Sequence, residues 1–155
     1  MAPRAFGLNC TLTPSPKSSS TQKMLDQVLG AIAAHGFETS HQRLVDLEIR
    51  PGVAADEGEG DDWPAVREKI LDARILVLAT PIWMGQPSSI TKRVFERLNA
   101  FLGEIDDDGR YPTFGRVAVT AVVGRQSFNF LLYNLKAMGE EDNFRILDNN
   151  QEHSI

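Results

Sequence analysis

A run of apolar residues that ends at a Thr-Pro pair constrains this chain more than any other feature. Residues 75–79 are apolar and rich in branched side chains, and Thr80-Pro81 ends the run. A short segment with one Trp and one Gly follows, and Ser88-Ser89 opens an amphipathic helix. This order places the segment at the carboxyl end of a parallel strand, where open α/β sheets bind ligands. A surface turn with one packed Trp would fit the stretch, taken alone, about equally well.

The rest of the chain alternates between strand-like and helix-like patterns. We expect strands at 5–12, 37–47, 75–80, 117–123 and 144–147, and helices at 21–36, from 63, at 88–103 and at 127–139. This alternation predicts an α/β fold with a doubly wound sheet. At 155 residues, a single domain over 1–155 is expected, with 149–155 as a frayed polar tail.

Composition narrows the classes of partner. The formal net charge is −5 and the acidic residues are clustered, which argues against nucleic acid or an anionic membrane as a partner. The single cysteine, Cys10, excludes an internal disulfide framework and fits a reducing compartment. No stretch has the length and hydropathy of a signal peptide or a membrane span. We therefore expect a soluble, cytoplasmic protein.

Charged residues on two elements are expected to face solvent. The acidic segment 56–62 lacks the order of ligands of a calcium loop, so a solvated loop is expected there, with Asp61 or Asp62 capping the next helix. The helix that begins near Ser89 has an apolar face that includes Phe101 and Leu102. Its opposite face is expected to be solvated and carries Lys92, Arg93, Glu96 and Arg97.

A segment rich in hydroxyl groups separates the first strand from the first helix. Residues 13–21 carry four Ser and two Thr and lead into the helix. Backbone N–H groups and the helix dipole make such an N-terminus a natural anion site. The glycine patterns of nucleoside-triphosphate and dinucleotide sites are absent from this segment. The alternative is a loop that only caps the helix or connects two elements.

Together these stretches resemble the flavodoxin-like NAD(P)H-dependent oxidoreductases, in the FMN reductase branch. The resemblance rests on Thr11–Thr21 and Thr80–Ser89, and it extends from about Ala5 to Gly124. It implies a flavodoxin-like sheet of strand order 2-1-3-4-5, with FMN across the carboxyl edge. After Gly124 the sequence Arg125–Asn129 differs from the usual polar loop of that family. We therefore expect a divergent or shortened carboxyl end, with an incomplete sheet as one alternative.

The resemblance also assigns cofactor-binding residues in three loops. Its phosphate loop is matched by Thr11, Ser19 and Thr21, with Ser18 and Ser20 as possible auxiliaries. The loop that contacts the flavin ring is matched by Pro81, Ile82, Trp83, Met84 and Gly85, and the start of a third flavin loop by Gly124.

Flavin chemistry would not require a catalytic side chain, because the cofactor carries the reaction and the protein positions it. We accordingly assign no catalytic residue, no metal ligand and no role to His35, His41 or His153. Cys10 is expected to be a small packed residue and not a nucleophile.

The resemblance implies FMN as cofactor, NAD(P)H as electron donor, and a quinone, azo compound or flavin as the small-molecule acceptor. It also implies a homodimer. One alternative is a flavodoxin-type electron carrier that docks a basic partner through its acidic segments. Another is a flavin-less binding domain on the same scaffold, since fold alone does not settle function.

Overall fold

A parallel sheet forms the centre of the structure, a computed structural model that describes residues 2–124 and 145–147. The strands are β1 (Arg4–Asn9), β2 (Glu38–Arg43), β3 (Ile75–Trp83), β4 (Gln86–Pro87), β5 (Val117–Val123) and β6 (Arg145–Leu147). The order is β2-β1-β3-β5-β6 with all four pairings parallel, while β4 folds back on β3 as a short antiparallel strand. The predicted doubly wound sheet of order 2-1-3-4-5 is therefore confirmed.

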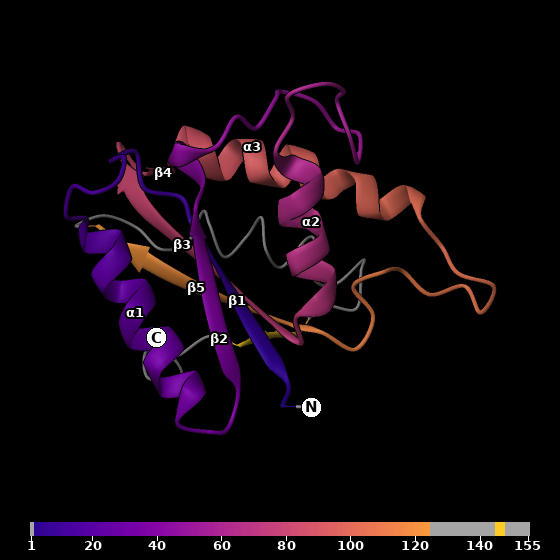
Figure 1. The fold of residues 1–155 in the computed structure, drawn as a ribbon, viewed down its shortest axis with the longest axis horizontal. Coiled ribbons are helices and arrows are strands. Elements are labelled where there is room, and N and C mark those ends of the chain that lie inside the picture. The colour runs from indigo at the N-terminus through magenta and orange to yellow at the C-terminus, as the bar shows by residue number, and fades with distance from the viewer. Residues whose placement is uncertain (1, 125–144, 148–155) are drawn as a thin grey trace, which may run out of the picture.

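Helices cover both faces of the sheet, because alternate residues of the buried strands point to opposite sides. Helix α1 (Ser20–Ala33) packs on one face through Leu25 and Leu29, which form a core with Val77. Helices α2 (Trp63–Asp72) and α3 (Ser89–Leu98) build the other core, which includes Phe6 and Leu76. In the view of Figure 1, α1 lies to the left of β2 and α2 to its right.

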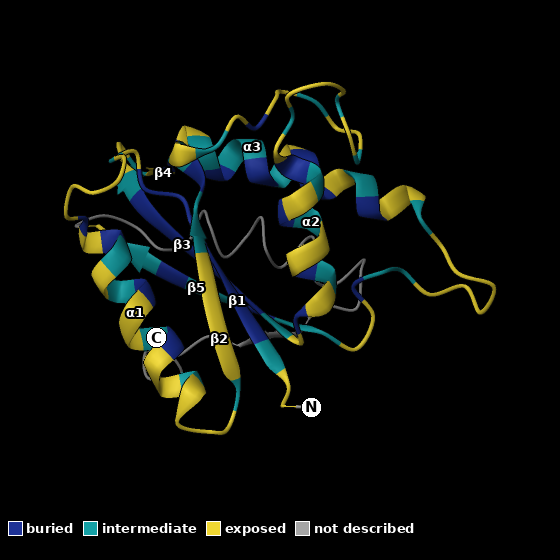
Figure 2. Cartoon of the chain, viewed as in Figure 1, coloured by how far each residue is buried: buried dark blue, intermediate teal, exposed yellow. Residues whose placement is uncertain are grey.

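The burial of each strand depends on its position in the sheet. Strand β1 is buried over most of its length, whereas the outer strand β2 is mainly exposed (Figure 2). Gly7 in β1 lets α1 approach closely, because a Cβ there would lie 2.9 Å from Leu25 Cδ1. The space for α1 is thus set by a residue without a side chain.

Several predicted elements end earlier than expected. After β2 the chain turns into the short 3₁₀ helix η1 (Leu44–Asp46), and after α3 into a second one, η2 (Asn99–Gly103). The tighter 3₁₀ winding changes which side chains share a face. Phe101 is accordingly 3% exposed and joins the core, as predicted. Leu102 was also predicted on the apolar face, but it is 39% exposed and lies outside the core. The predicted helix at 127–139 and the tail at 149–155 lie outside the described residues.

Arg97 corrects the prediction of a solvated outer face on α3, because it is only 1% exposed. Its guanidinium donates to the backbone oxygens of Arg50 (2.9 Å) and Ala54 (3.1 Å) and to Asp61 Oδ2 (2.7 Å). The side chains of Arg97 and Asp61 are both fully buried. This ion pair fastens the loop after η1 onto α3.

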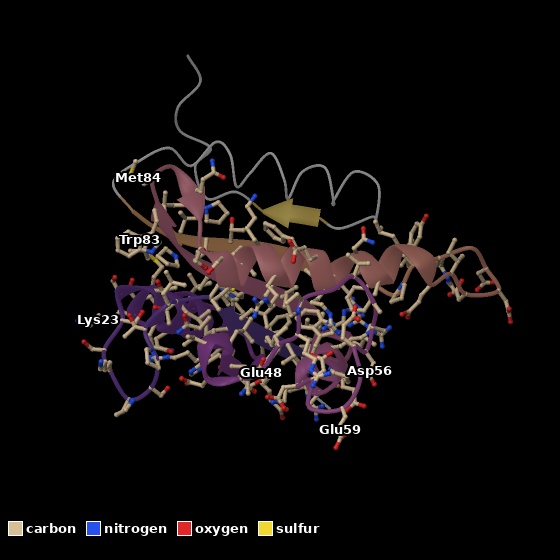
Figure 3. The ribbon with its side chains drawn as sticks, turned by 90° about the horizontal axis from the view of Figure 1, so that it is seen from above. Lys23, Glu48, Asp56, Glu59, Trp83 and Met84 are labelled. Atoms are coloured by element: carbon tan, nitrogen blue, oxygen red, sulfur yellow. The ribbon has the colours of Figure 1, made fainter. Side chains whose placement is uncertain are left out.

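Asp61 is likewise an exception within the acidic segment 56–62, which was expected to form a solvated loop. Asp56 and Glu59 point away from the body (Figure 3). The Asp61 carboxylate instead accepts backbone N–H groups of Arg50, Glu57 and Trp63. Its bond to Trp63 satisfies the first N–H of α2 from the residue before the N-cap. Asp62 occupies the N-cap position, but its carboxylate accepts the Glu48 N–H (2.9 Å).

We expect Arg97→Met to lower the free energy of unfolding by about 3 kcal/mol, because it leaves a buried carboxylate and two carbonyls without their donor. Urea denaturation of purified protein measures this loss. Glu96→Gln changes an exposed neighbour on the same helix and should stay within about 0.5 kcal/mol of the original protein. A similar small effect of Arg97→Met would contradict the role of the ion pair.

Asp61 should also make the free energy of unfolding depend on pH in the acidic range. Burial acts to raise the pKa of Asp61, but the hydrogen bonds from Arg97 and three backbone N–H groups outweigh it and lower the pKa to about 2. The unfolded value is about 3.9, so the stability contributed by the ionised group is present above pH 4 and is lost as the pH falls towards 2. We expect Asp61→Asn to show a shallower loss of stability over this range, whereas Glu59→Gln should leave the slope unchanged.

Candidate functional site

Three segments that follow parallel strands meet at the carboxyl edge of the sheet. They are residues 10–19 after β1, the turn after β3, and Gly124 after β5. The Cys10 N–H donates to Ala79 O (2.8 Å), which extends the β1–β3 pairing to the start of the first segment. The carboxyl edge therefore brings together the first two loops that the sequence predicted and Gly124, the residue at which the third begins.

A buried cluster of hydroxyl groups joins the first two segments below the surface. Ser88 Oγ donates to Cys10 O (2.7 Å) and accepts the N–H of Thr91 (3.2 Å) as the N-cap of α3. The Thr91 hydroxyl donates to Thr80 Oγ1 (2.7 Å) at the end of β3. All three hydroxyl residues are at most 2% exposed. The cluster fixes the end of β1, the end of β3 and the start of α3 relative to one another.

We call residues 11–19 the anion loop. Ser19 is the N-cap of α1, and its hydroxyl donates to Thr11 Oγ1 (2.9 Å) while accepting the Gln22 N–H (3.4 Å). Thr11 Oγ1 also accepts the Thr13 N–H (3.2 Å). The Thr11–Ser19 pair has two hydroxyl protons and uses one between them, so one proton is left for a further acceptor. An anion could accept that proton.

Backbone donors at the start of α1 extend this surface. The first N–H groups of a helix have no partner within the helix and carry a partial positive charge. Ser18 and Ser20, on either side of the N-cap, are exposed, whereas Thr21 is only 1% exposed. The structure thus brings Thr11, Ser18, Ser19 and Ser20 together and places the Thr21 side chain inside.

Beneath the anion loop, Asn9 acts as a polar anchor that the sequence did not single out. It is fully buried, its Oδ1 accepts the Thr11 N–H (3.1 Å), and its Nδ2 donates to Gln22 Oε1 (2.7 Å). A buried amide with both ends bonded holds a unique arrangement. Asn9 therefore ties the start of the loop to the first turn of α1.

The segment after β3 is a two-residue hairpin and not an irregular loop. Trp83 pairs with Gln86, and Met84 and Gly85 form the turn at φ values of 51° and 76°. Two positive φ angles are the mark of a type I′ turn, which favours Asn-Gly. Met84 is 96% and Trp83 60% exposed, so Trp83 is not the packed residue of a plain surface turn. Figure 3 shows both at one end of the molecule.

Pro81 and Ile82 form the base of this hairpin, and Gly124 lies against it. Pro81 is buried and Ile82 is half-buried. A Cβ on Gly124 would lie 2.8 Å from Ile82 Cβ, so only glycine allows this close approach. The third predicted loop therefore begins beside the second.

Cys10 is a packed residue, as predicted. It is fully buried, and burial raises the pKa of its thiol to about 12 despite a hydrogen bond with Thr91. Within residues 2–124 and 145–147, no group of three His, Cys, Asp or Glu side chains could hold a metal ion. In the same residues, no helix is long and apolar enough to cross a membrane.

Two charged residues that the sequence analysis overlooked also contact the anion loop. Arg43 ends β2, and its guanidinium donates to Lys17 O (2.9 Å). Asp46 belongs to η1 and accepts the Ser15 hydroxyl (2.6 Å). Their place just after a parallel strand was the available signal, since the carboxyl ends of such strands meet at one edge.

Comparison with known proteins assigns the family. The NADPH-dependent FMN reductase family matches residues 4–145, and the chain therefore belongs to it. The resemblance stated from the sequence is confirmed.

Two curated relatives are substantially longer than this chain. One, the 8-demethyl-8-aminoriboflavin-5'-phosphate synthase of Streptomyces davaonensis, is 34% identical over 136 residues, which are 81% of this chain and 52% of that protein. The other is named divalent metal cation transporter MntH, from Mycobacterium bovis. It is 38% identical over 146 residues, or 88% of this chain and 21% of that protein.

A solved structure is similar over nearly the whole chain. It is RosB with a bound intermediate, 8-demethyl-8-formylriboflavin-5'-phosphate. The two share a TM-score of 0.75 and 27% identity, over 98% of this chain and 68% of that one.

The strained turn yields a test of stability. We expect Met84→Asn to raise the free energy of unfolding by about 0.5–1 kcal/mol, because Asn tolerates the left-handed conformation better than Met. Urea denaturation would measure the change. Met84→Leu keeps both the strain and the apolar side chain and should be neutral. A Met84→Asn protein no more stable than the original would contradict the type I′ assignment.

Proposed function

We propose that this chain binds FMN across the carboxyl edge of its sheet and acts as an NAD(P)H-dependent oxidoreductase on a small acceptor. The acceptor classes are a quinone, an azo compound or a free flavin. The observation that carries the proposal is the joining of the anion loop and the hairpin by the Ser88–Cys10 hydrogen bond. One bound molecule with an anionic end and a flat apolar end could use both surfaces.

The anion loop fits the phosphate end of the cofactor. The spare hydroxyl proton of the Thr11–Ser19 pair and the N–H groups at the start of α1 are donors of the kind that bind phosphate. Ser18 and Ser20 could add hydroxyl donors from the exposed side. Thr21 is the weakest member of the proposed set, because its side chain is almost fully covered.

The hairpin fits the ring end. Trp83 offers an exposed aromatic face, and the polypeptide from Pro81 to Gly85 offers backbone groups at the same edge. Gly124 lets the start of the third predicted loop lie directly against Ile82. When bound, the flavin supplies the redox chemistry by taking hydride from a nicotinamide and passing electrons on. The task of these residues is to bind and orient it.

Assembly and setting are parts of the same proposal. Trp83 and Met84 are large apolar side chains exposed next to the site, and a second copy of the chain would cover them. This supports the predicted homodimer. The free thiol of Cys10 is compatible with the predicted cytoplasmic setting.

The absorption spectrum of the purified protein tests cofactor binding. We expect flavin bands at about one FMN per chain after addition of FMN and removal of the excess. Ser19→Ala should raise the FMN Kd about tenfold or more, because it removes a charge-assisted hydrogen bond to the phosphate. Trp83→Ala should raise it by a similar factor, because it removes contact with the flavin ring. Ser40→Ala and Phe114→Ala, at exposed positions on β2 and before β5, serve as controls. Unchanged affinity in both site variants would show that the site lies elsewhere.

Steady-state oxidation of NADH and NADPH separates the enzyme from an electron carrier. We expect turnover with a quinone as acceptor, whereas a flavodoxin-type carrier would oxidise either nicotinamide poorly. A protein that binds FMN tightly but gives no turnover with any of the three acceptor classes would favour the carrier.

A second candidate function follows from the named relative and from the RosB complex, in which a flavin phosphate is the bound intermediate. A synthase of this kind would bind a flavin phosphate as its substrate, and not as a cofactor, and would alter it chemically. The mass of the flavin recovered after NADPH turnover tells the two apart. An oxidoreductase returns FMN of unchanged mass.

A further inference from the structure

The anion loop is held in shape from outside, by the end of β2 and the turn that follows it. We propose that Arg43 and Asp46 are positioning residues, which hold the backbone N–H groups of the anion loop in place for a phosphate without contacting the phosphate themselves. This inference rests on the proposed function and assigns a new role to two residues outside the predicted site.

Asp46 fixes the middle of the loop. One carboxylate oxygen accepts the Ser15 N–H (2.9 Å) and the other accepts the Ser15 O–H (2.6 Å). Both acceptors therefore act on a single residue. The hydroxyl and backbone bonds from Ser15 lower the pKa of Asp46. The group is thus an anion at neutral pH.

Arg43 holds the backbone of the anion loop on both sides of Ser15, at Thr13 and at Lys17. Its Nη1 donates to Lys17 O (2.9 Å) and to Thr13 O (3.4 Å), and its Nη2 donates to Gln22 Oε1 (3.3 Å) in α1. A planar guanidinium has donors in a fixed fork, which a lysine ammonium cannot reproduce. Arg43 therefore sets the distance of Thr13 and Lys17 from the start of α1.

The bond to Lys17 also determines where the next N–H points. In a trans peptide the C=O and the N–H point in opposite directions. Because Lys17 O faces Arg43, the N–H of Ser18 in the same peptide faces away from Arg43. Ser18 directly precedes the N-cap Ser19, where the anion is expected. Arg43 thus acts on the phosphate site through the orientation of this peptide.

Charge and position predict opposite effects for Asp46. A carboxylate beside a phosphate site repels the ligand, so on charge alone Asp46→Ala should tighten FMN binding. Alanine, however, has no acceptor for either the N–H or the O–H of Ser15. A positioning role therefore predicts weaker binding despite the removal of a negative charge. The sign of the change decides between the two roles.

The experiment compares the Kd values of FMN and of riboflavin, which lacks the phosphate, by quenching of flavin fluorescence. We expect Asp46→Ala and Arg43→Lys each to weaken FMN binding about tenfold, the worth of one or two hydrogen bonds, and to leave riboflavin binding unchanged. Glu48→Gln is the matched control, because it removes an exposed negative charge two residues from Asp46 (Figure 3). Thermal unfolding checks that each variant is folded.

Two results would overturn the inference alone. One is FMN binding by folded Asp46→Ala that is as tight as, or tighter than, that of the original protein. The other is an equal weakening of FMN and riboflavin, which would mean a general loss of structure at the site. If the original protein binds neither flavin, both this inference and the proposed function are wrong.

Discussion

The hydrogen bond from Ser88 Oγ to the carbonyl of Cys10, at 2.7 Å, connects the parts of the molecule that matter for its site. It joins the end of β1 to the start of α3, and through Thr91 it reaches the end of β3. Because the cluster is buried, no water competes for these bonds and each is electrostatically stronger than at the surface. The anion loop and the hairpin accordingly start from a rigid common base.

The ion pair between Arg97 and Asp61 has a comparable effect at the other end of α3. Both side chains are fully buried, and the carboxylate is surrounded by donors from three backbone positions. Such a pair contributes specificity more than net stability, because desolvation offsets much of the attraction. Here it specifies the path of the long loop between η1 and α2, which has no strand to hold it.

Local sequence was sufficient for the framework. The apolar run at 75–79 predicted the central strand because only a doubly covered strand buries every residue. Ser88-Ser89 predicted the start of α3, since a hydroxyl at the N-cap satisfies a free N–H within a few residues of itself, and the start of α1 lies one residue before the predicted Thr21. The family, the strand order and the three flavin loops came instead from the resemblance carried by Thr11–Thr21 and Thr80–Ser89. The assignment of individual cofactor contacts remains a prediction.

What the sequence determined by itself is therefore the order of the strands, that of the first three helices, and, through the resemblance, the family. The tertiary structure alone decided that Arg97 is buried, that Trp83 is exposed on a hairpin, and that Arg43 and Asp46 support the anion loop. The physical reason is the separation of the partners. Arg97 meets Asp61 across 36 positions and Asp46 meets Ser15 across 31. A charged residue is buried or solvated according to such distant partners, and helical periodicity carries no information about them.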